Sequence, residues 1–217
     1  MLKNICLNGK TKDGTKFYLF FSGLARHRFY YSSYQSLPLS LMSTLNSQKL
    51  KLNGKTAVFI DYANVYGWKK SLKKPVDAVK LYKYLKTYPN ITAIEFYYGS
   101  DVNKKSKDFL KEIKTCGFQL VTKPVKYIDI SNTKKPVLIR KCDFDIEICM
   151  SVYKHLERKI DSFVFFSGDG DLIPLYRYLI EHRKQVIVIY QSGHLGKEIW
   201  ETKKGIFKTE ITNFPVF

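Results

Sequence analysis

The chain has 217 residues, and its 37 Lys and Arg against 19 Asp and Glu give a formal net charge of +18. This length fits one sizeable core with an appendage and is too short for two full α/β domains. The charge predicts a polyanionic partner, nucleic acid before an anionic membrane surface. The absence of a span-length apolar run or a signal-peptide core indicates a cytoplasmic protein without a membrane partner.

Residues 1–55 differ in composition from the rest of the chain. They contain nine basic residues and one acid, Asp13, together with clustered aromatic residues. A strand is expected over residues 16–21, and the serine- and leucine-rich residues 32–47 suit a linker. We interpret residues 1–55 as a basic, aromatic-rich N-terminal extension.

From Thr56 the pattern changes to alternating strands and helices, which predicts a parallel sheet wrapped by helices. The expected fold is therefore an α/β domain over residues 56–217. Strands are expected over residues 57–60, 91–98, 118–125, 163–166, 186–190 and 206–211, and helices over residues 77–87, 104–115, 143–157, 172–183 and 195–202.

Two of the predicted strands end in acidic residues. The strand at 163–166 is followed by Ser167-Gly-Asp169-Gly-Asp171, and the strand at 57–60 is followed by Asp61 with Asn64 three residues on. One aspartate in such a turn is commonly a helix N-cap. A loop with two needs only one cap, and the carboxyl ends of parallel strands are where α/β proteins bind ligands.

A third acidic residue begins a predicted helix. Asp145 shares a helical face with the apolar residues Ile148, Cys149, Val152 and Leu156, whereas Asp143 and Glu147 share a polar face. Asp145 is therefore expected at the head of the buried stripe. A carboxylate there is costly unless a positive charge compensates it.

These carboxylates are expected to meet at one edge of the sheet. Asp61 and Asp169 follow strands that should be neighbours, and the helix headed by Asp145 leads into the second of them. At about 4 Å and an effective dielectric near 20, each like-charged pair costs on the order of 4 kcal/mol. Mg²⁺ or Mn²⁺, as one ion or two, would compensate this repulsion, with Lys141 as an alternative source of part of the charge.

Basic residues follow the first three predicted strands of the domain. Around an acidic centre such runs predict a phosphate track, although a charge run is commonly just a solvated face. Tyr66 and Trp68 could stack on unpaired bases, whereas Tyr62 is expected to close over the core. The basic candidates for RNA binding are Lys69, Lys70, Lys73, Lys74, Lys104, Lys105, Lys134, Lys135 and Arg140.

Several common motifs are absent from the sequence. It has no Walker loop, no His-Glu-x-x-His and no Gly-x-Gly-x-x-Gly after a strand. The four cysteines have neither zinc-ligand spacing nor a secreted disulfide pattern, so reduced thiols are expected. Among the histidines, only His194 is positioned to face the acidic edge.

Three motifs in order resemble the NYN domain family, the LabA-like branch of PIN-like nucleases. They are Phe59-Ile-Asp-Tyr-Ala-Asn64, Lys141-Cys-Asp-Phe-Asp-Ile-Glu147 and Ser167-Gly-Asp-Gly-Asp-Leu172. The resemblance implies a PIN-like three-layer α/β/α sandwich and divalent-metal-dependent cleavage of RNA. It places Asp61, Asn64, Asp145 and Asp169 at the centre, with Asp171 and Ser167 in support. Ser151 stands where many relatives carry another aspartate, and residues 1–55 have no counterpart in the family pattern.

The expected function is a metal-dependent endoribonuclease acting on single-stranded or structured RNA. Asp61, Asp145 and Asp169 would bind the metal, Asn64 would orient a ligand or phosphate, and Asp171 would hold a water or cap its helix. Two alternatives are a non-catalytic RNA-binding or scaffolding module and a metal-dependent phosphatase, which would leave the lysines without a role. The sequence is compatible with a homo-oligomer.

Overall fold

The computed structural model describes residues 5–10, 16–21, 49–129 and 138–217. Contacts group the chain into two units, Met1–Pro38 and Leu39–Phe217. In the first unit, β1 (Ile5–Lys10) pairs antiparallel with β2 (Lys16–Phe21), which is the strand expected at these residues. The role expected for residues 1–55 stays a prediction, although Leu50 and Leu52 pack against the core of the second unit.

The second unit is built on a six-stranded sheet of order β10-β9-β8-β3-β4-β5, in which every neighbouring pair is parallel. All residues of the two central strands are buried, in line with their continuous apolar sequences. The α/β fold class with a mostly parallel sheet is confirmed. The strands are β3 (Thr56–Asp61), β4 (Ile91–Ser100), β5 (Gln119–Pro124), β8 (Ser162–Phe166), β9 (Gln185–Tyr190) and β10 (Ile206–Glu210).

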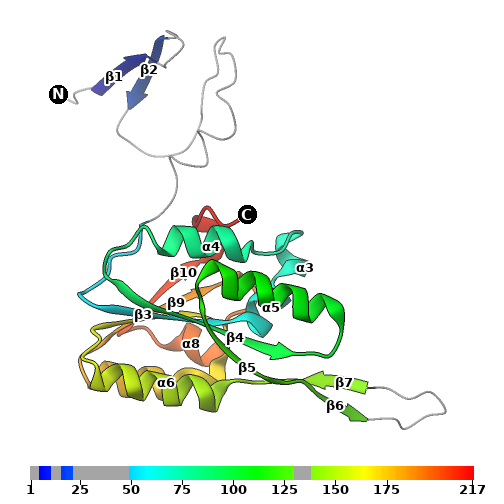
Figure 1. The fold of residues 1–217 in the computed structure, drawn as a ribbon. Coiled ribbons are helices and arrows are strands. Elements are labelled where there is room, and N and C mark those ends of the chain that lie inside the picture. Colours follow the sequence, from blue (N-terminus) through cyan, green and yellow to red (C-terminus); the bar gives the residue numbers. More distant parts are fainter. Residues whose placement is uncertain (1–4, 11–15, 22–48, 130–137) are drawn as a thin grey trace. The chain divides into compact units, whose positions relative to one another are not determined.

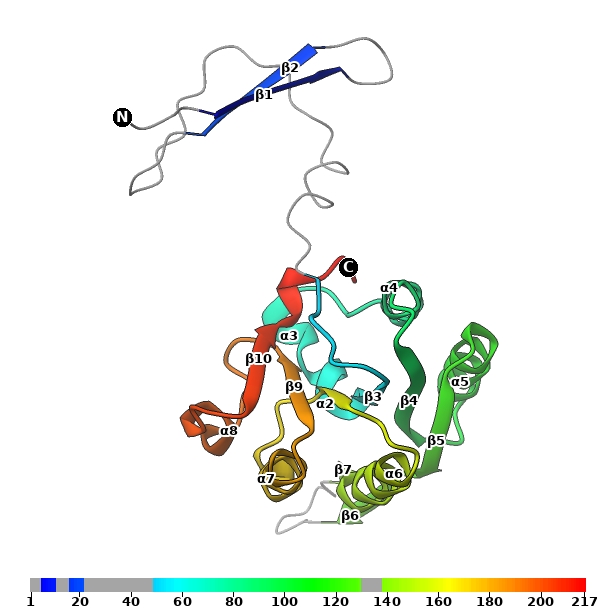
Figure 2. The same ribbon diagram turned by 90° about the vertical axis from the view of Figure 1, so that its left-hand side faces the viewer.

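Helices cover both faces of this sheet (Figures 1 and 2). One apolar cluster joins the sheet to α2, α4 and α5, and a second joins its other face to α6, α7 and α8, so the unit has three layers. The helices are α2 (Tyr62–Gly67), α3 (Lys69–Leu72), α4 (Ala78–Leu85), α5 (Lys104–Cys116), α6 (Asp145–Glu157), α7 (Ile173–Glu181) and α8 (Lys197–Glu201).

Two features of the second unit were not predicted. The short helices α2 and α3 follow β3 directly, where only a loop was expected. An antiparallel hairpin of β6 (Lys126–Asp129) and β7 (Leu138–Lys141) separates β5 from α6. It projects from the end of the unit at which β4 and β5 finish (Figure 1).

No helix among the described residues is long and apolar enough to cross a bilayer.

Because the sheet is parallel throughout, the carboxyl ends of β3 and β8 lie side by side, with Ile60 opposite Phe166. The loops after these two strands therefore start from adjacent positions at one edge, as the sequence predicted.

Candidate active site

Asp61 is the last residue of β3 and the N-cap of α2. Its Oδ1 accepts hydrogen bonds from the backbone N–H groups of Ala63 at 3.1 Å and Asn64 at 3.3 Å. The side chain is held by these bonds before any ligand is considered, and the residue is only 8% exposed. Asp61 is therefore a buried carboxylate, fixed at the carboxyl end of a central strand.

Asn64 links the two strand-end loops. Its Oδ1 accepts one hydrogen bond from the indole N–H of Trp68 and another from the backbone N–H of Gly168, both at 3.0 Å. The carboxamide oxygen is thus engaged within the protein, which leaves the Nδ2 group for the ligand-orienting role that we expected. The observed bonds make Asn64 a residue that positions the loop after β8.

The loop after β8 carries the second aspartate as a cap. The Oδ1 of Asp169 accepts the N–H of Asp171 at 2.9 Å at the start of the 3₁₀ helix η1 (Gly170–Leu172), and the Oγ of buried Ser167 accepts the N–H of Asp169 at 3.2 Å. Asp169 is therefore the capping residue, whereas Asp171 is exposed. Of the two roles expected for Asp171, the cap is taken by its neighbour.

A close backbone contact holds this loop in place. The N–H of Gly196 donates to the carbonyl of Gly168 at 2.7 Å, and a Cβ added at Gly168 would lie 1.6 Å from the carbonyl oxygen of His194. A side chain at residue 168 is thus sterically excluded. His194 itself bonds Ser71 through Nε2 at 2.7 Å, so its imidazole is engaged outside the acidic loop.

Asp145 is the first residue of α6, and its helix packs on the sheet through Ile148 and Val152 as the period predicted. Burial raises the pKa of Asp145, and the negative charges of Asp169, Asp143 and Asp171 raise it further, while Lys123 opposes them. Asp145 therefore lies within electrostatic reach of the loop after β8.

Asp61 has the same electrostatic signature. Burial raises its pKa from the ordinary 3.8 to about 6; backbone N–H donation from Asn64 and Ala63 opposes this shift, and the charges of Asp169 and Asp145 add to it. The structure thus brings Asp61, Asp145 and Asp169 to one edge of the sheet, where each destabilises the charged form of the others.

The three carboxylates are not positioned as the ligands of one metal ion would be. In the part of the chain that the structure describes, no group of three or more His, Cys, Asp or Glu side chains could hold a metal ion as placed. Like charges repel at short range, so a closer approach of the carboxylates requires a cation between them.

A buried tyrosine lies within electrostatic range of all three carboxylates. Tyr176 of α7 is fully buried, and its hydroxyl has no hydrogen-bond partner among the residues that the structure describes. Burial raises the pKa of Tyr176 well above its ordinary value, and the charges of Asp169, Asp61 and Asp145 raise it further. Tyr176 lies within the helix expected over residues 172–183, but nothing local in the sequence marks its hydroxyl.

The donor set fits a hard divalent cation. Carboxylate oxygens are the ligands that Mg²⁺ and Mn²⁺ prefer, and here they come from three separate elements. In Asp61 and Asp169 the capping bonds are made by Oδ1, which leaves Oδ2 for an ion. The buried hydroxyl of Tyr176, which lacks a partner within the described part of the chain, would be available as a further hydrogen-bond donor.

The predicted basic residues are exposed around this edge, with one correction among the aromatic residues. Trp68 is 0% exposed and belongs to the core, so it cannot stack on a base; α2 returns its indole to the protein, where Asn64 binds it. Tyr66 is 56% exposed, with the Lys69 ammonium 5.8 Å from its ring centre. Tyr62 packs on Phe96, as expected. Lys141, expected as a source of compensating charge, is also exposed, and Lys134 and Lys135 lie outside the described residues. The exposed basic candidates for RNA binding are Lys69, Lys70, Lys73, Lys74, Lys104, Lys105 and Arg140.

A buried polar cluster beneath α6 was not predicted. Glu95 of β4 accepts hydrogen bonds from Tyr97 and Ser151 and contacts His155 Nε2 at 2.7 Å. Burial alone would raise the pKa of Glu95, but these bonds outweigh burial and lower the pKa below 4.5. Ser151, the position at which the sequence departs from the family pattern, thus belongs to a cluster that joins α6 to the sheet.

Comparisons with known proteins agree with this architecture. The sequence model described as NYN domain matches residues 55–203. A crystal structure of a protein of unknown function from Vibrio parahaemolyticus superposes with a TM-score of 0.57 at 20% identity, covering 76% of this chain and 98% of that one. No curated protein matches the sequence. The structural likeness supports the fold alone.

Proposed function

Because the chain belongs to the NYN domain family, whose members are nuclease-like proteins that usually use divalent metals, we propose that it is a metal-dependent endoribonuclease. The observation that carries the proposal is the meeting of Asp61, Asp145 and Asp169 at the carboxyl edge of a parallel sheet. The net charge of +18 favours a polyanionic substrate.

In this proposal the aspartates bind the metal ion, and Asn64 positions the loop after β8. Asp61, Asp145 and Asp169 would hold one or two ions, and Asn64 would keep the loop after β8 in register with α2. A bound Mg²⁺ or Mn²⁺ would supply positive charge that polarises the phosphodiester and an attacking water. Asp171, which is exposed and free of the cap, would accept a proton from a water that attacks phosphorus, and the oxygen that leaves phosphorus would take up a proton from solvent.

The test is cleavage of single-stranded and structured RNA by the full chain, in Mn²⁺ and in chelator. Asp145→Asn and Asp169→Asn should each lower the metal-dependent rate by about 100-fold or more, the scale expected for removing one charge-stabilising group. Asp108→Asn is the matched control, because Asp108 is exposed on α5 and its substitution removes the same charge. Equal activity in all three variants would contradict the assignment.

A second candidate is a non-catalytic RNA-binding or scaffolding module of the same fold. It is favoured by the spacing of the carboxylates, which do not form a metal-holding group among the described residues. RNA binding that survives both Asn substitutions, with no cleavage by the unsubstituted chain in any metal, would support this module in place of the enzyme.

A further inference from the structure

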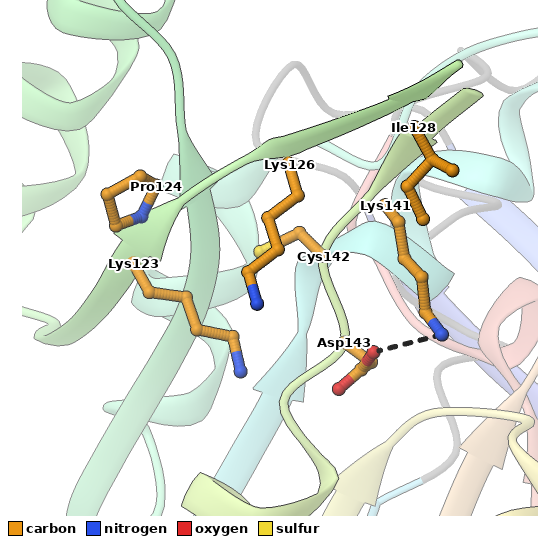
Figure 3. Close-up of a pocket in the computed structure, with 7 residues that line it drawn as sticks. All are labelled: Lys123, Pro124, Lys126, Ile128, Lys141, Cys142 and Asp143. Atoms are coloured by element: carbon orange, nitrogen blue, oxygen red, sulfur yellow. Dashed lines mark ion pairs between the residues drawn. The ribbon is translucent and has the colours of Figure 1, made fainter. Parts of the chain in front are cut away.

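The projecting hairpin β6–β7 forms one wall of a cavity beside α6. The cavity has a volume of about 310 Å³, at the lower end of the range for small-ligand pockets. Its walls come from the end of β5, both hairpin strands and the segment that enters α6, two residues before Asp145. The residues that the argument uses are Lys123, Lys126, Ile128, Lys141, Cys142 and Asp143 (Figure 3).

The hairpin register places like charges opposite each other. Lys126 pairs directly with Lys141, and both lysines line the cavity. Like charges at directly opposite positions destabilise an antiparallel pair. The nearest compensation is weak, because Lys141 is 3.9 Å from Asp143 and both side chains are more than half exposed. An anion between the two lysines would remove this repulsion.

The third lysine of the cavity is differently engaged. Lys123 forms an ion pair with Glu147 at 2.7 Å and lies 4.8 Å from the ring centre of Phe144, so its charge is already compensated. In Figure 3 the side chains of Lys123, Lys126 and Lys141 leave their strands on the same side, the side on which Asp143 lies. Lys126 and Lys141 are therefore the cations available to a ligand.

Apolar side chains lie next to this cationic pair. Ile128 lines the cavity and pairs across the hairpin with Ile139, and the two are 44% and 46% exposed. Isoleucines this exposed on a projecting hairpin contribute little to the folding core. An exposed apolar surface beside a pair of cations is suited to the base or sugar of a nucleotide.

The base of the hairpin is held against β4, which fixes the cavity relative to Asp145. The N–H of Val125 donates to the carbonyl of Ser100 at 3.0 Å, and Arg140 donates to the carbonyl of Gly99 at 3.1 Å. A Cβ at Gly99 would lie 2.8 Å from the sulfur of Cys142, so the chain can pass this closely only because residue 99 is glycine. The cavity is thus a preformed neighbour of the acidic edge.

We propose that this cavity binds one nucleotide of a single-stranded RNA, with a phosphate between Lys126 and Lys141 and the unpaired base or ribose against Ile128 and Ile139. The assignment rests on the proposed function for its substrate class. The bound nucleotide would be a neighbour of the phosphodiester that is cleaved. A base paired in a duplex would not be free to reach the isoleucines.

The experiment is fluorescence anisotropy of the full chain with a labelled 12-nucleotide oligouridylate and with an RNA duplex of the same length, in chelator so that no cleavage occurs. K126Q/K141Q removes both cations, and K83Q/K86Q at the C-terminal end of α4 is the control with the same charge change at exposed positions. Circular dichroism checks that both variants fold.

Losing the contacts to one single-strand phosphate should lower the slope of log affinity against log salt by about 0.7, equivalent to about 5-fold weaker binding at 0.1 M salt. The control should change the slope much less. Equal losses in the two variants would overturn the proposal, because net charge alone would explain them. An equal loss for duplex RNA would overturn the assignment to a single strand.

The outcomes for the cavity and for the enzyme are separable. If the unsubstituted chain binds but never cleaves RNA, and K126Q/K141Q loses binding, the cavity assignment stands and the nuclease proposal fails. If the chain cleaves RNA in Mn²⁺ and K126Q/K141Q binds and cleaves normally, the cavity assignment fails and the nuclease proposal stands.

Discussion

Replacing Asp61 with asparagine should stabilise the metal-free protein at neutral pH. The pKa of Asp61 is about 6 in the folded chain and 3.8 in a reference free of the fold. At about 1.4 kcal/mol per pKa unit, this gap corresponds to about 3 kcal/mol. Asparagine is a good N-cap, so Asp61→Asn keeps the bonds to the N–H groups of α2 while it removes the buried charge.

The sign follows from proton binding. Between pH 4 and 6 the folded state retains a proton that the unfolded state releases, so the stability of the unsubstituted chain falls as the pH rises through this window. The gain from Asp61→Asn should therefore be about 3 kcal/mol at pH 7.5 and less than about 1 kcal/mol at pH 4. For a domain of this size, 3 kcal/mol raises the melting temperature by roughly 6–12 °C.

Urea unfolding in chelator at the two pH values measures this difference directly. Added Mn²⁺ should then reverse the order of stability, because the ion stabilises the unsubstituted chain and binds the variant weakly. The reasoning fails if Asp61→Asn is no more stable than the unsubstituted chain at pH 7.5, or if its gain is the same at both pH values.

Three further predictions concern the surroundings of the site. Glu95→Ala should lower the free energy of unfolding in urea by about 3–5 kcal/mol, because it leaves His155 without its partner. The unsubstituted chain should lose the stabilising contribution of Glu95 as the pH falls below 4.5. A cost of the substitution under about 1 kcal/mol would contradict this reasoning. Gly168→Ala should abolish RNA cleavage and lower the melting temperature, because the added Cβ would collide with the carbonyl of His194. Gly67→Ala is the control and should change neither, since a Cβ there meets no described atom within 4 Å. Equal effects of the two substitutions would refute the steric argument. Tyr176→Phe should stabilise the metal-free chain by about 1 kcal/mol, because it removes a buried hydroxyl that has no partner among the described residues. The same substitution should weaken Mn²⁺ binding measured by calorimetry. Unchanged Mn²⁺ affinity would show that Tyr176 takes no part in binding the ion.

The sequence predicted the features that depend on local pattern. Continuous apolar runs identified β3 and β8, and the alternation of strands and helices implied that their ends meet. The 3.6-residue period placed Asp145 at the head of the buried face of α6. These predictions held because a parallel sheet with crossover helices leaves few ways to connect such elements.

The features that were missed depend on contacts between distant residues. Helix α2 has only six residues, too few to show a period, and Trp68 looked exposed because its partner Asn64 acts only once α2 has formed. Glu95 meets His155 sixty residues later in the chain. The hairpin was not predicted, because its strands have only four residues each and Lys126 lies opposite Lys141, and pairing of like charges is disfavoured in strands.

The two capping bonds have a consequence for how an ion would be recognised. Backbone amides fix the rotamers of Asp61 and Asp169 as the chain folds, so neither side chain loses further conformational freedom when a cation arrives. The entropic penalty of ordering these two ligands would then fall on folding, and the desolvation of their carboxylates would remain for the association step. Selectivity between Mg²⁺ and Mn²⁺ would accordingly depend on Asp145, the one of the three whose carboxylate accepts no backbone hydrogen bond among the described residues.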